Sequence, residues 1–422
     1  MNSLKPMLLT SLKSYDRTQF VKDVTAGIIV AIIALPLSIA LALASGVGPE
    51  AGIFTAIVAG FVISALGGSS VQIAGPTAAF ATIVAGIVAK DGMDGLVIAT
   101  ILAGIFLVLM GLCHFGSLIK FIPFTITTGF TSGIAVTIVI GQLKDFFGLT
   151  YPDGVKPIET TEKFRAVVEN FSTINIDALI VGAVSLAVLI IAPYIFKRIP
   201  GSLIAVIIGI LMVQFLPLKV STIGNLYTIN NSLPSFHLPA VSFEVVQNAL
   251  PNAFTIAVLA AIESLLSCVV ADGMINGKHR SDMELVAQGA GNIASALFGG
   301  IPATGAIART AANIKNGGRT PIAGIVHSIT LVIVLVVLMP YAGMIPMPTI
   351  AAILFIVAYN MCQWRTFVKL VKTAPKSDII VLFASFILTV LFDLVVAIEI
   401  GMVLACLLFI KRMSEETHVN SW

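Results

Sequence analysis

Two charged side chains, Arg309 and Glu263, lie inside long hydrophobic segments of this chain, where charge is rare. A guanidinium in the middle of a bilayer is costly unless it faces a water-filled cavity or a partner, so such a residue is a functional candidate. The positive charge of Arg309 can complete a binding site for an anion. The alternative is that Arg309 is the structural counterion of a buried carboxylate.

Glu263 is the candidate for proton coupling, because its nearest charged neighbour in the sequence is Asp272, nine positions on. Low dielectric favours the neutral form of a carboxyl group and a nearby cation favours the charged form, so such a group can bind and release a proton. The alternative is a permanent Glu263–Arg309 ion pair that fixes the packing of two helices. Ser264 and Ser267 are auxiliary candidates for hydrogen bonding, either to a substrate or to their own helix.

Two hydrophobic runs stop at a double glycine, cross a few extended residues and restart as a new helix. One copy runs from Gly67-Gly68 to Gly75-Pro76-Thr77, and the other from Gly299-Gly300 to Thr304-Gly305. We place Pro76-Thr77 and Thr304-Gly305 in the first turns of the new helices, where proline is tolerated. Free N–H groups and the dipole at a helix N-terminus attract anions. Paired broken segments predict a transporter's binding site, whereas the alternative is that glycine and proline merely kink two packed helices.

The composition excludes a water-soluble protein. Of 422 residues, 58% are hydrophobic and only 11% are charged, and the apolar runs repeatedly reach the roughly 20 residues that cross a bilayer. The four cysteines show no CxxC or Cys/His spacing, and His114 and His327 have no partners spaced as ligands, so we expect no metal and no other cofactor. The sequence contains no phosphate-binding loop, catalytic triad motif or basic aromatic cluster, which argues against an ATP-driven pump, an enzyme and a nucleic-acid partner.

Hydrophobicity, glycines, prolines and charges together predict an all-α membrane protein with fourteen membrane segments. The first seven lie at about 24–45, 51–66, 76–89, 95–114, 123–142, 175–196 and 201–217. The second seven lie at about 248–271, 284–298, 304–315, 320–340, 346–361, 378–392 and 394–411. Asp393 is expected at an interface, and Glu399 is expected to pack or to cap the last segment.

The distribution of basic residues supports this count. If residues 1–23 are cytoplasmic, most of the 24 Lys and Arg residues fall on the cytoplasmic side of the cell membrane, as the positive-inside rule requires. The tail 413–422 then lies on the same side. Seven segments in each half give 24–217 and 248–412 opposite orientations, which predicts seven-plus-seven inverted repeats. The first apolar run lacks a small-residue cleavage site, so we interpret it as a membrane segment and not as a signal peptide.

The third and tenth segments, 76–89 and 304–315, are too short to cross a bilayer alone. Such half-helices, each preceded by a short extended segment, are tolerated at membrane depth where they line a cavity in the protein. The polar stretches 146–174 and 218–247 are expected to be extracellular loops, without a second domain.

Several motifs together resemble the sulfate permease (SulP) anion-transporter superfamily, as a prokaryotic member. The longest is Gly299-Gly300-Ile301-Pro302-Ala303-Thr304-Gly305-Ala306-Ile307-Ala308-Arg309-Thr310-Ala311-Ala312-Asn313. The others, in order along nearly the whole chain, are Ala34-Leu35-Pro36, Gly75-Pro76-Thr77, Ile262-Glu263-Ser264-Leu265-Leu266-Ser267, Val269-Val270-Ala271-Asp272 and Gly317-Gly318-Arg319-Thr320-Pro321. Family chains usually continue into a cytoplasmic STAS domain, whereas this one ends at Trp422 after the membrane domain.

The resemblance implies a core domain (segments 1–4 and 8–11) that moves against a gate domain (segments 5–7 and 12–14) in an elevator-like cycle, usually in a homodimer. It implies an anion site formed by Ser38, Leu41, Thr77, Ala78, Gly305, Ala306, Ile307, Ala308 and Arg309. Glu263 matches the family's acid in the eighth segment. Sodium-coupled bicarbonate members carry Asp there and a hydroxyl where this chain has Ile307, so the resemblance favours protons as the coupling ion.

We therefore expect secondary active transport of a small anion (bicarbonate, sulfate or a dicarboxylate such as fumarate or succinate) by proton-coupled symport. An uncoupled anion exchanger or a chloride-type channel is the alternative, because Arg309 and the helix dipoles alone can pass an anion. A nucleobase carrier of the same architecture would share the broken helices but would not need Arg309.

Overall fold

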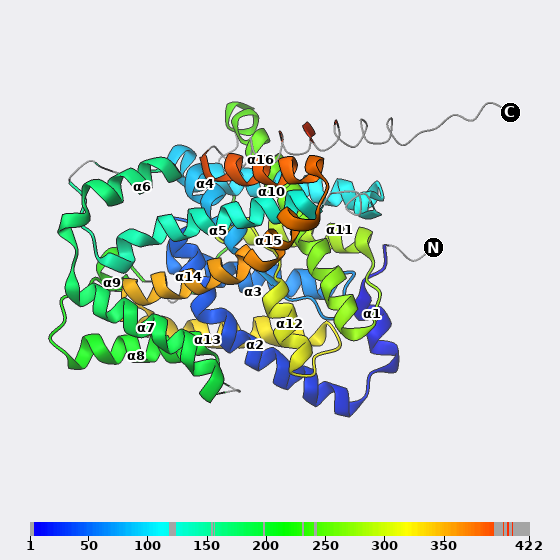
Figure 1. Ribbon diagram of the computed structural model, residues 1–422. Coiled ribbons are helices and arrows are strands. Elements are labelled where there is room, and N and C mark those ends of the chain that lie inside the picture. The colour runs from blue at the N-terminus through cyan, green and yellow to red at the C-terminus, as the bar shows by residue number, and fades with distance from the viewer. Residues whose placement is uncertain are drawn as a thin grey trace.

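The computed structural model describes residues 4–117, 124–152, 155, 157–196, 199–229, 232–239, 243–391, 400, 403, 404 and 407. Within them the protein is mostly helical (Figure 1). The first half contains α1 (Met7–Ser11), η1 (Leu12–Ser14), α2 (Arg17–Ala44), α3 (Pro49–Leu66), β1 (Ala74–Gly75), α4 (Ala78–Leu112), α5 (Phe124–Phe147), α6 (Thr160–Glu169), η3 (Phe171–Thr173), α7 (Ile176–Ile195) and α8 (Gly201–Phe215). The second half contains α9 (Ile223–Leu226), α10 (Phe243–Ile275), α11 (Ser281–Leu297), β2 (Thr304–Gly305), α12 (Ile307–Lys315), α13 (Ile322–Ala342), α14 (Met347–Cys362), α15 (Trp364–Thr373) and α16 (Lys376–Leu391).

The described helices are those of a multi-pass membrane protein. Eight of them are long and apolar enough to cross a membrane, namely α2, α3, α4, α5, α7, α10, α13 and the α14–α15 pair. Four shorter helices, α8, α11, α12 and α16, coincide within a few residues with predicted segments. The seven-plus-seven repeat stays a prediction. Only four residues of the last segment, 394–411, are described, and Asp393, Glu399 and the tail 413–422 lie outside the described residues.

The predicted third and fourth segments are joined in one long helix, α4, which is kinked at Gly92. This residue has φ 70° and ψ −171°, a backbone conformation that residues other than glycine rarely adopt. The kink lies between Asp91 and Asp94, whose exposed side chains mark the polar break that the sequence indicated. One glycine therefore turns the chain where the sequence predicted a loop.

Three helices occur where the sequence analysis predicted loops. Helices α6 and α9 lie in the polar stretches 146–174 and 218–247, and each begins with a capping box that stabilises a helix without much apolar burial. Helix α15 follows α14 after Gln363, whose left-handed φ of 44° interrupts the helix. The composition of α15 is polar enough to be typical of a loop. Its apolar and basic residues are nevertheless spaced so that they lie on different faces of a helix, which makes it amphipathic.

The helices pack in two groups. The first group consists of α2, α3, α4, α10, α11, α12 and α13, in which α4 packs against α10 and α11, and α13 packs against α2 and α3. The second group consists of α5, α7, α8, α14 and α16, in which α5 packs against α14 and α16, and α7 packs against α8 and α14. In Figure 1, α7 and α8 lie at the lower left, and α11, α12 and the N-terminal α1 lie at the right.

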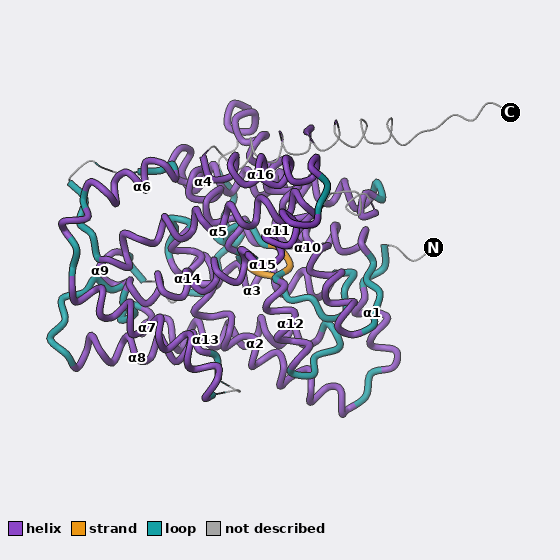
Figure 2. The backbone as a smooth tube through the Cα atoms, viewed as in Figure 1, coloured by secondary structure: helices purple, strands orange, loops and turns teal. Residues whose placement is uncertain are grey.

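The two strands lie inside the helical body and are drawn in orange in Figure 2. They pair antiparallel, with Ala74 opposite Gly305 and Gly75 opposite Thr304. The N–H group of Ala306 adds a hydrogen bond to the carbonyl oxygen of Ile73 at 2.9 Å. Backbone groups at membrane depth need such internal partners because lipid supplies none. The extended residues before α4 and α12 therefore provide hydrogen-bond partners for each other's backbone groups.

Asn292 of α11 anchors the chain just before β2. Its Oδ1 accepts a hydrogen bond from the Ala303 N–H at 2.8 Å, and its Nδ2 donates to the Ala303 carbonyl at 2.9 Å and to the Gln288 carbonyl at 2.8 Å. The side chain is fully buried. Both backbone groups of Ala303 thus depend on one amide.

Replacing Asn292 by Leu is expected to lower the free energy of unfolding by about 2–3 kcal/mol, because two buried backbone groups lose their partner. The melting temperature of the purified protein in detergent measures this loss. The matched control is Asn316→Leu at an exposed position, which is expected to change the melting temperature little. Equal melting temperatures for the two variants would contradict the anchoring role.

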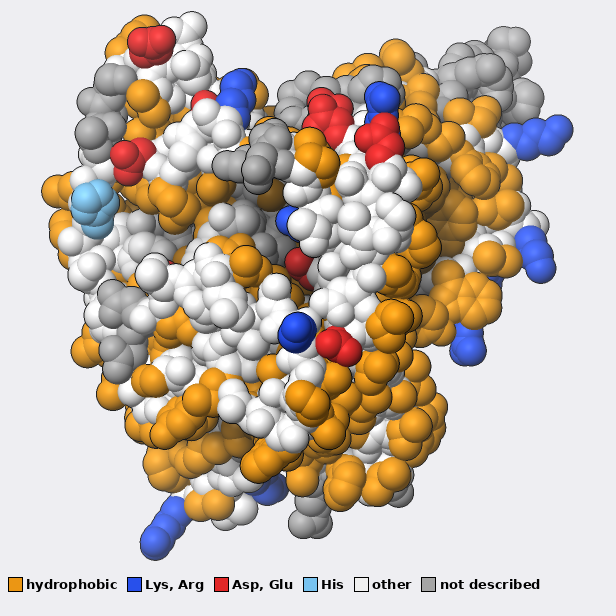
Figure 3. All heavy atoms as spheres, turned by 90° about the vertical axis from the view of Figure 1, so that its left-hand side faces the viewer, with side chains coloured by type: hydrophobic (Ala, Val, Ile, Leu, Met, Phe, Trp, Pro, Cys, Tyr) orange, Lys and Arg blue, Asp and Glu red, His pale blue; other side chains and the backbone are white. Residues whose placement is uncertain are grey.

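Hydrophobic side chains cover much of the outer surface. Figure 3, which faces the left-hand side of Figure 1, shows them gathered along the flanks with few charged side chains between them. Exposed apolar residues include Ile191 of α7, Ile207 of α8 and Val337 of α13. Such a surface is suited to contact with lipid tails. Charged side chains inside a protein with this surface are candidates for a functional site.

Candidate functional site

A cavity of about 310 Å³ lies between the two groups of helices. From the first group α2, α4, α10 and α12 contribute to its wall, and from the second group α5 and α14 do so. Nine residues singled out by the sequence analysis line it: Leu41, Thr77, Ala78, Glu263, Gly305, Ala306, Ile307, Ala308 and Arg309. The fold thus brings these residues from four separate stretches of the chain to one cavity.

Arg309 lines this cavity although its side chain is only 1% exposed. Its Nη2 donates to the Pro76 carbonyl oxygen at 3.1 Å and to Ser38 Oγ at 3.4 Å. The remaining nitrogens, Nε and Nη1, have no hydrogen-bond partner among the described residues. Gly75 makes room for the guanidinium, since a Cβ atom there would collide with Nη1. A fixed guanidinium whose charge is not neutralised by a described carboxylate is suited to attracting an anion.

Glu263 is half-buried and also faces the cavity. Its Oε2 accepts a hydrogen bond from Thr77 Oγ1 at 3.1 Å. The ion pairs between described residues are His114–Asp282, Arg165–Glu169 and His279–Asp272. The Glu263–Arg309 ion pair that the sequence left open is therefore not formed in this structure, nor is Arg309 the counterion of another described carboxylate. A carboxylate that meets the cavity without a cationic partner can exchange a proton with water there.

Both helices that point their N-termini at the cavity begin later than the sequence analysis predicted. Helix α4 begins at Ala78 with Thr77 as N-cap, and α12 begins at Ile307 with Ala306 as N-cap. The placement of Pro76 and of Thr304-Gly305 in the first turns was wrong, because Gly75 and Thr304-Gly305 are held in the strand pair. Neither N-cap side chain bonds to its helix, so the first N–H groups are free of side-chain caps.

The remaining predicted residues lie behind the cavity wall. Ser38 is fully buried and contacts Arg309 as described above. Ser264 Oγ shares a hydrogen bond with Thr304 Oγ1 at 2.6 Å and accepts one from the Gly305 N–H at 3.1 Å, so it supports β2. Ser267 is buried, and its hydroxyl has no hydrogen-bond partner among the described residues. The two auxiliary serines are not among the residues that line the cavity.

The sequence analysis missed the wall that the second group of helices supplies. This wall consists of Phe124, Thr127, Thr128, Phe130 and Thr131 from α5, Val357, Asn360 and Met361 from α14, and Gln363. The concentration of threonines near the start of an apolar segment was the available signal. The hydroxyl groups of Thr127 and Thr128 donate to the Phe124 carbonyl oxygen of their own helix.

Comparison with known proteins gives relatives along almost the whole chain. The family profile described as "Sulfate permease family" matches residues 20–385. The chain is 42% identical over 415 residues to YvdB of Bacillus subtilis, provisionally named a sulfate transporter, with 97% of this chain and 77% of that protein covered. It is 33% identical over 403 residues to the bicarbonate transporter BicA of Picosynechococcus sp., with 93% of this chain and 70% of that protein covered.

A solved structure has the same fold. The transmembrane domain of a cyanobacterium bicarbonate transporter BicA matches with a TM-score of 0.81 at 29% identity, and the match covers 91% of this chain and 98% of that one. The similarity therefore extends over both groups of helices and includes the elements around the cavity.

Proposed function

Because the chain belongs to the sulfate permease family of anion transporters, we propose that it carries a small anion, bicarbonate or sulfate, across the cell membrane together with protons. The names of the relatives supply these two substrates, and a dicarboxylate such as succinate is a third. The observation that carries the proposal is one cavity lined by a guanidinium and a carboxylate, neither of which forms an ion pair with a described residue, and by two helix N-termini without side-chain caps.

The anion is proposed to bind between the starts of α4 and α12. Thr77, Ala78 and residues 305–308 line the cavity there, and each helix start carries a partial positive charge and free N–H groups. Arg309 adds a full charge to the same place. Ser38 and Leu41 from α2 complete this site, the first by holding the guanidinium and the second as part of the wall.

Coupling to protons is supported by the contact between Glu263 and Thr77. Thr77 is the N-cap of α4 and donates to the Glu263 carboxylate, so this negative charge lies directly beside the proposed anion site. Repulsion between two nearby charges weakens anion binding while Glu263 is ionised and disappears when it is protonated. Proton and anion then favour each other's binding, and by linkage the effect is reciprocal. The hydrocarbon side chain of Ile307 offers no oxygen ligand to a sodium ion.

An elevator-like movement is the corresponding mechanism. The elements of the proposed site, α4, α10, α12 and the strand pair, belong to the first group of helices, and the second group closes the cavity from the opposite side. We propose that the first group is the core domain and the second the gate domain, within seven-plus-seven inverted repeats and a homodimer with cytoplasmic termini. Movement of the core would carry the whole site past the gate.

An uncoupled anion exchanger or channel is the second candidate function. The two free nitrogens of Arg309 favour it, because a positive site can bind an anion without any proton. A nucleobase carrier receives no such support, since a neutral ring does not require the unpaired guanidinium.

Uptake into proteoliposomes tests the proposal. Labelled sulfate, bicarbonate and succinate are supplied with an inward proton gradient, with an inward sodium gradient or with neither. We expect uptake of at least one anion to increase with the proton gradient and to ignore sodium. Uptake that is indifferent to both gradients would refute coupling, and unitary currents in planar bilayers would favour the channel instead.

A further inference from the structure

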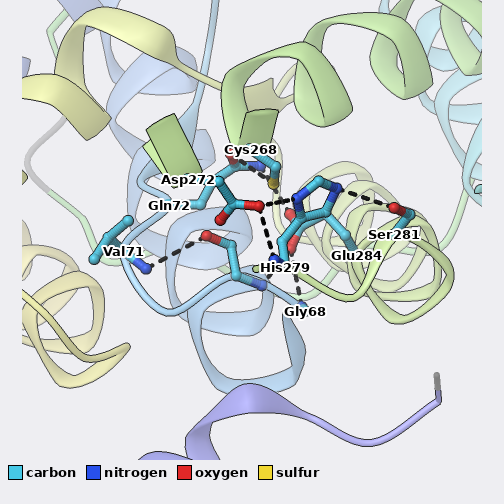
Figure 4. A network of polar contacts seen from close by, with 9 residues as sticks. Gly68, Val71, Gln72, Cys268, Asp272, His279, Ser281 and Glu284 are labelled. Atoms are coloured by element: carbon cyan, nitrogen blue, oxygen red, sulfur yellow. Dashed lines mark hydrogen bonds and ion pairs between the residues drawn. The ribbon is translucent and has the colours of Figure 1, made fainter. Parts of the chain in front are cut away.

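A buried carboxylate outside the cavity is surrounded by hydrogen-bond donors (Figure 4). Glu284 of α11 is fully buried. Its Oε2 accepts from the N–H groups of Gly68 at 2.9 Å and Ser69 at 3.1 Å. Its Oε1 accepts from Gln72 Nε2 and from Gln288 Nε2, both at 2.8 Å. Four N–H donors thus meet one carboxylate, and none of these hydrogen bonds belongs to the site described above.

The first double glycine allows the chain to approach Glu284 this closely. A Cβ atom at Gly68 would collide with the carbonyl oxygen of Arg280, the residue before α11. In return the Arg280 N–H donates to the Gly68 carbonyl oxygen at 3.0 Å. The Gly67-Gly68 motif therefore does more than end α3, because it presses the loop before β1 against the start of α11.

Gln72 connects Glu284 to the strand pair. Its amide donates to Glu284 and accepts a hydrogen bond from Cys268 Sγ at 3.2 Å, so both ends of the amide are held. The same amide lies directly against Gly305, where an added Cβ atom would collide with it. Gly305 is a residue of β2 that lines the cavity. The position of the Gln72 amide therefore determines how far this backbone can recede from the cavity.

We propose that Glu284 is a positioning residue for the anion site, which it reaches through Gln72 and β2. This inference rests on the proposed anion transport. All four partners of Glu284 are N–H donors. A glutamine at this position would therefore point its NH₂ group at one or more of these N–H donors. Gln72 would then lose its orientation, and β2 and the start of α12 would shift. Small displacements of binding groups are costly in preorganised sites.

Glu284→Gln tests this role at constant side-chain size. We expect the KM of anion uptake to rise about tenfold, as the loss of about 1.4 kcal/mol from a charged hydrogen bond implies. Vmax per folded protein is expected to stay near that of the unmodified chain. The concentration of sulfate needed for half-maximal thermal stabilisation should rise by the same factor. Gln72→Leu should raise KM similarly, and the double variant should add little, because both act through one link.

Cys268→Ala is the comparison variant, since it removes the weaker thiol contact of Gln72 and leaves the Glu284 contact intact; its KM should rise less than that of Glu284→Gln. An unchanged KM in both Glu284→Gln and Gln72→Leu, or a loss confined to Vmax, would overturn the positioning role. If Glu284→Gln does not elute from a size-exclusion column as a single folded species, the KM of Gln72→Leu decides whether the positioning role holds. If the unmodified protein neither transports nor binds any of the anions, the proposed function is refuted. If sulfate stabilises the protein but is not transported, the sulfate concentration for half-maximal stabilisation, compared between Glu284→Gln and the unmodified chain, decides the role of Glu284.

Discussion

Replacing Arg309 by Gln is expected to reduce anion uptake at least about a hundredfold. The substitution removes the positive charge that Arg309 brings to the cavity wall, together with the guanidinium donors that hold it there. Charge-assisted hydrogen bonds contribute about 1.5–3 kcal/mol each, and about 2.8 kcal/mol corresponds to a factor of one hundred in binding. Initial rates of uptake into proteoliposomes, at equal amounts of reconstituted protein, measure the effect.

Two controls separate charge from geometry. Arg309→Lys retains the charge but lacks the planar set of donors that reaches Ser38 and Pro76, so we expect a smaller loss of about tenfold. Ser38→Ala removes one of the two contacts that hold the guanidinium and keeps its charge and the contact with Pro76, so its loss should be much smaller than that of Arg309→Gln. If Arg309→Gln transported at the rate of the unmodified chain, the helix N-termini alone would suffice for anion binding, and Arg309 would have a structural role.

Replacing Glu263 by Gln is expected to abolish the response of uptake to the proton gradient. Glutamine has nearly the same shape and can still accept the hydrogen bond from Thr77, but it cannot take up a proton. Uptake should therefore be the same with and without an inward gradient. The comparison is made at a fixed anion concentration below KM, with gradients set by internal and external buffers.

Thr77→Val provides the contrast for Glu263. It removes the hydroxyl donor and keeps the carboxylate, so uptake should still increase with the proton gradient, although with lower anion affinity because Thr77 lines the proposed anion site. A Glu263→Gln protein that responds to the gradient as strongly as the unmodified chain would remove Glu263 from the coupling mechanism.

Much of the candidate site was predictable from local features of the sequence. Arg309 and Glu263 were conspicuous because charge is rare in apolar segments. The presence of short extended segments after each double glycine followed from glycines and proline between hydrophobic runs, but Thr304-Gly305 were assigned to the helix and lie in a strand. The placement of the helix starts was wrong by two or three residues. The strand pair takes Thr304-Gly305 of the helix predicted at 304–315, and Pro76-Thr77 lie between β1 and the start of α4.

Other parts of the site depended on contacts between distant residues. Glu284 begins an unremarkable helix in the sequence, and its importance emerges from donors in a loop more than 200 positions earlier. The threonines of α5 were visible, but nothing local indicated that α5 would face α4 and α12. Helix α15 was missed because its composition is that of a basic loop and its amphipathic spacing spans only ten residues.

The sequence by itself determined that this is a helical membrane protein and that a guanidinium and a carboxylate lie within its apolar segments, because both follow from composition and local spacing. The tertiary structure decided how these groups are used. It gave Glu263 a threonine partner, left two nitrogens of Arg309 without a partner among the described residues and placed both residues in the wall of a cavity between two groups of helices. Partners far apart in the chain are selected by how whole helices pack, and that choice depends on many weak contacts at once.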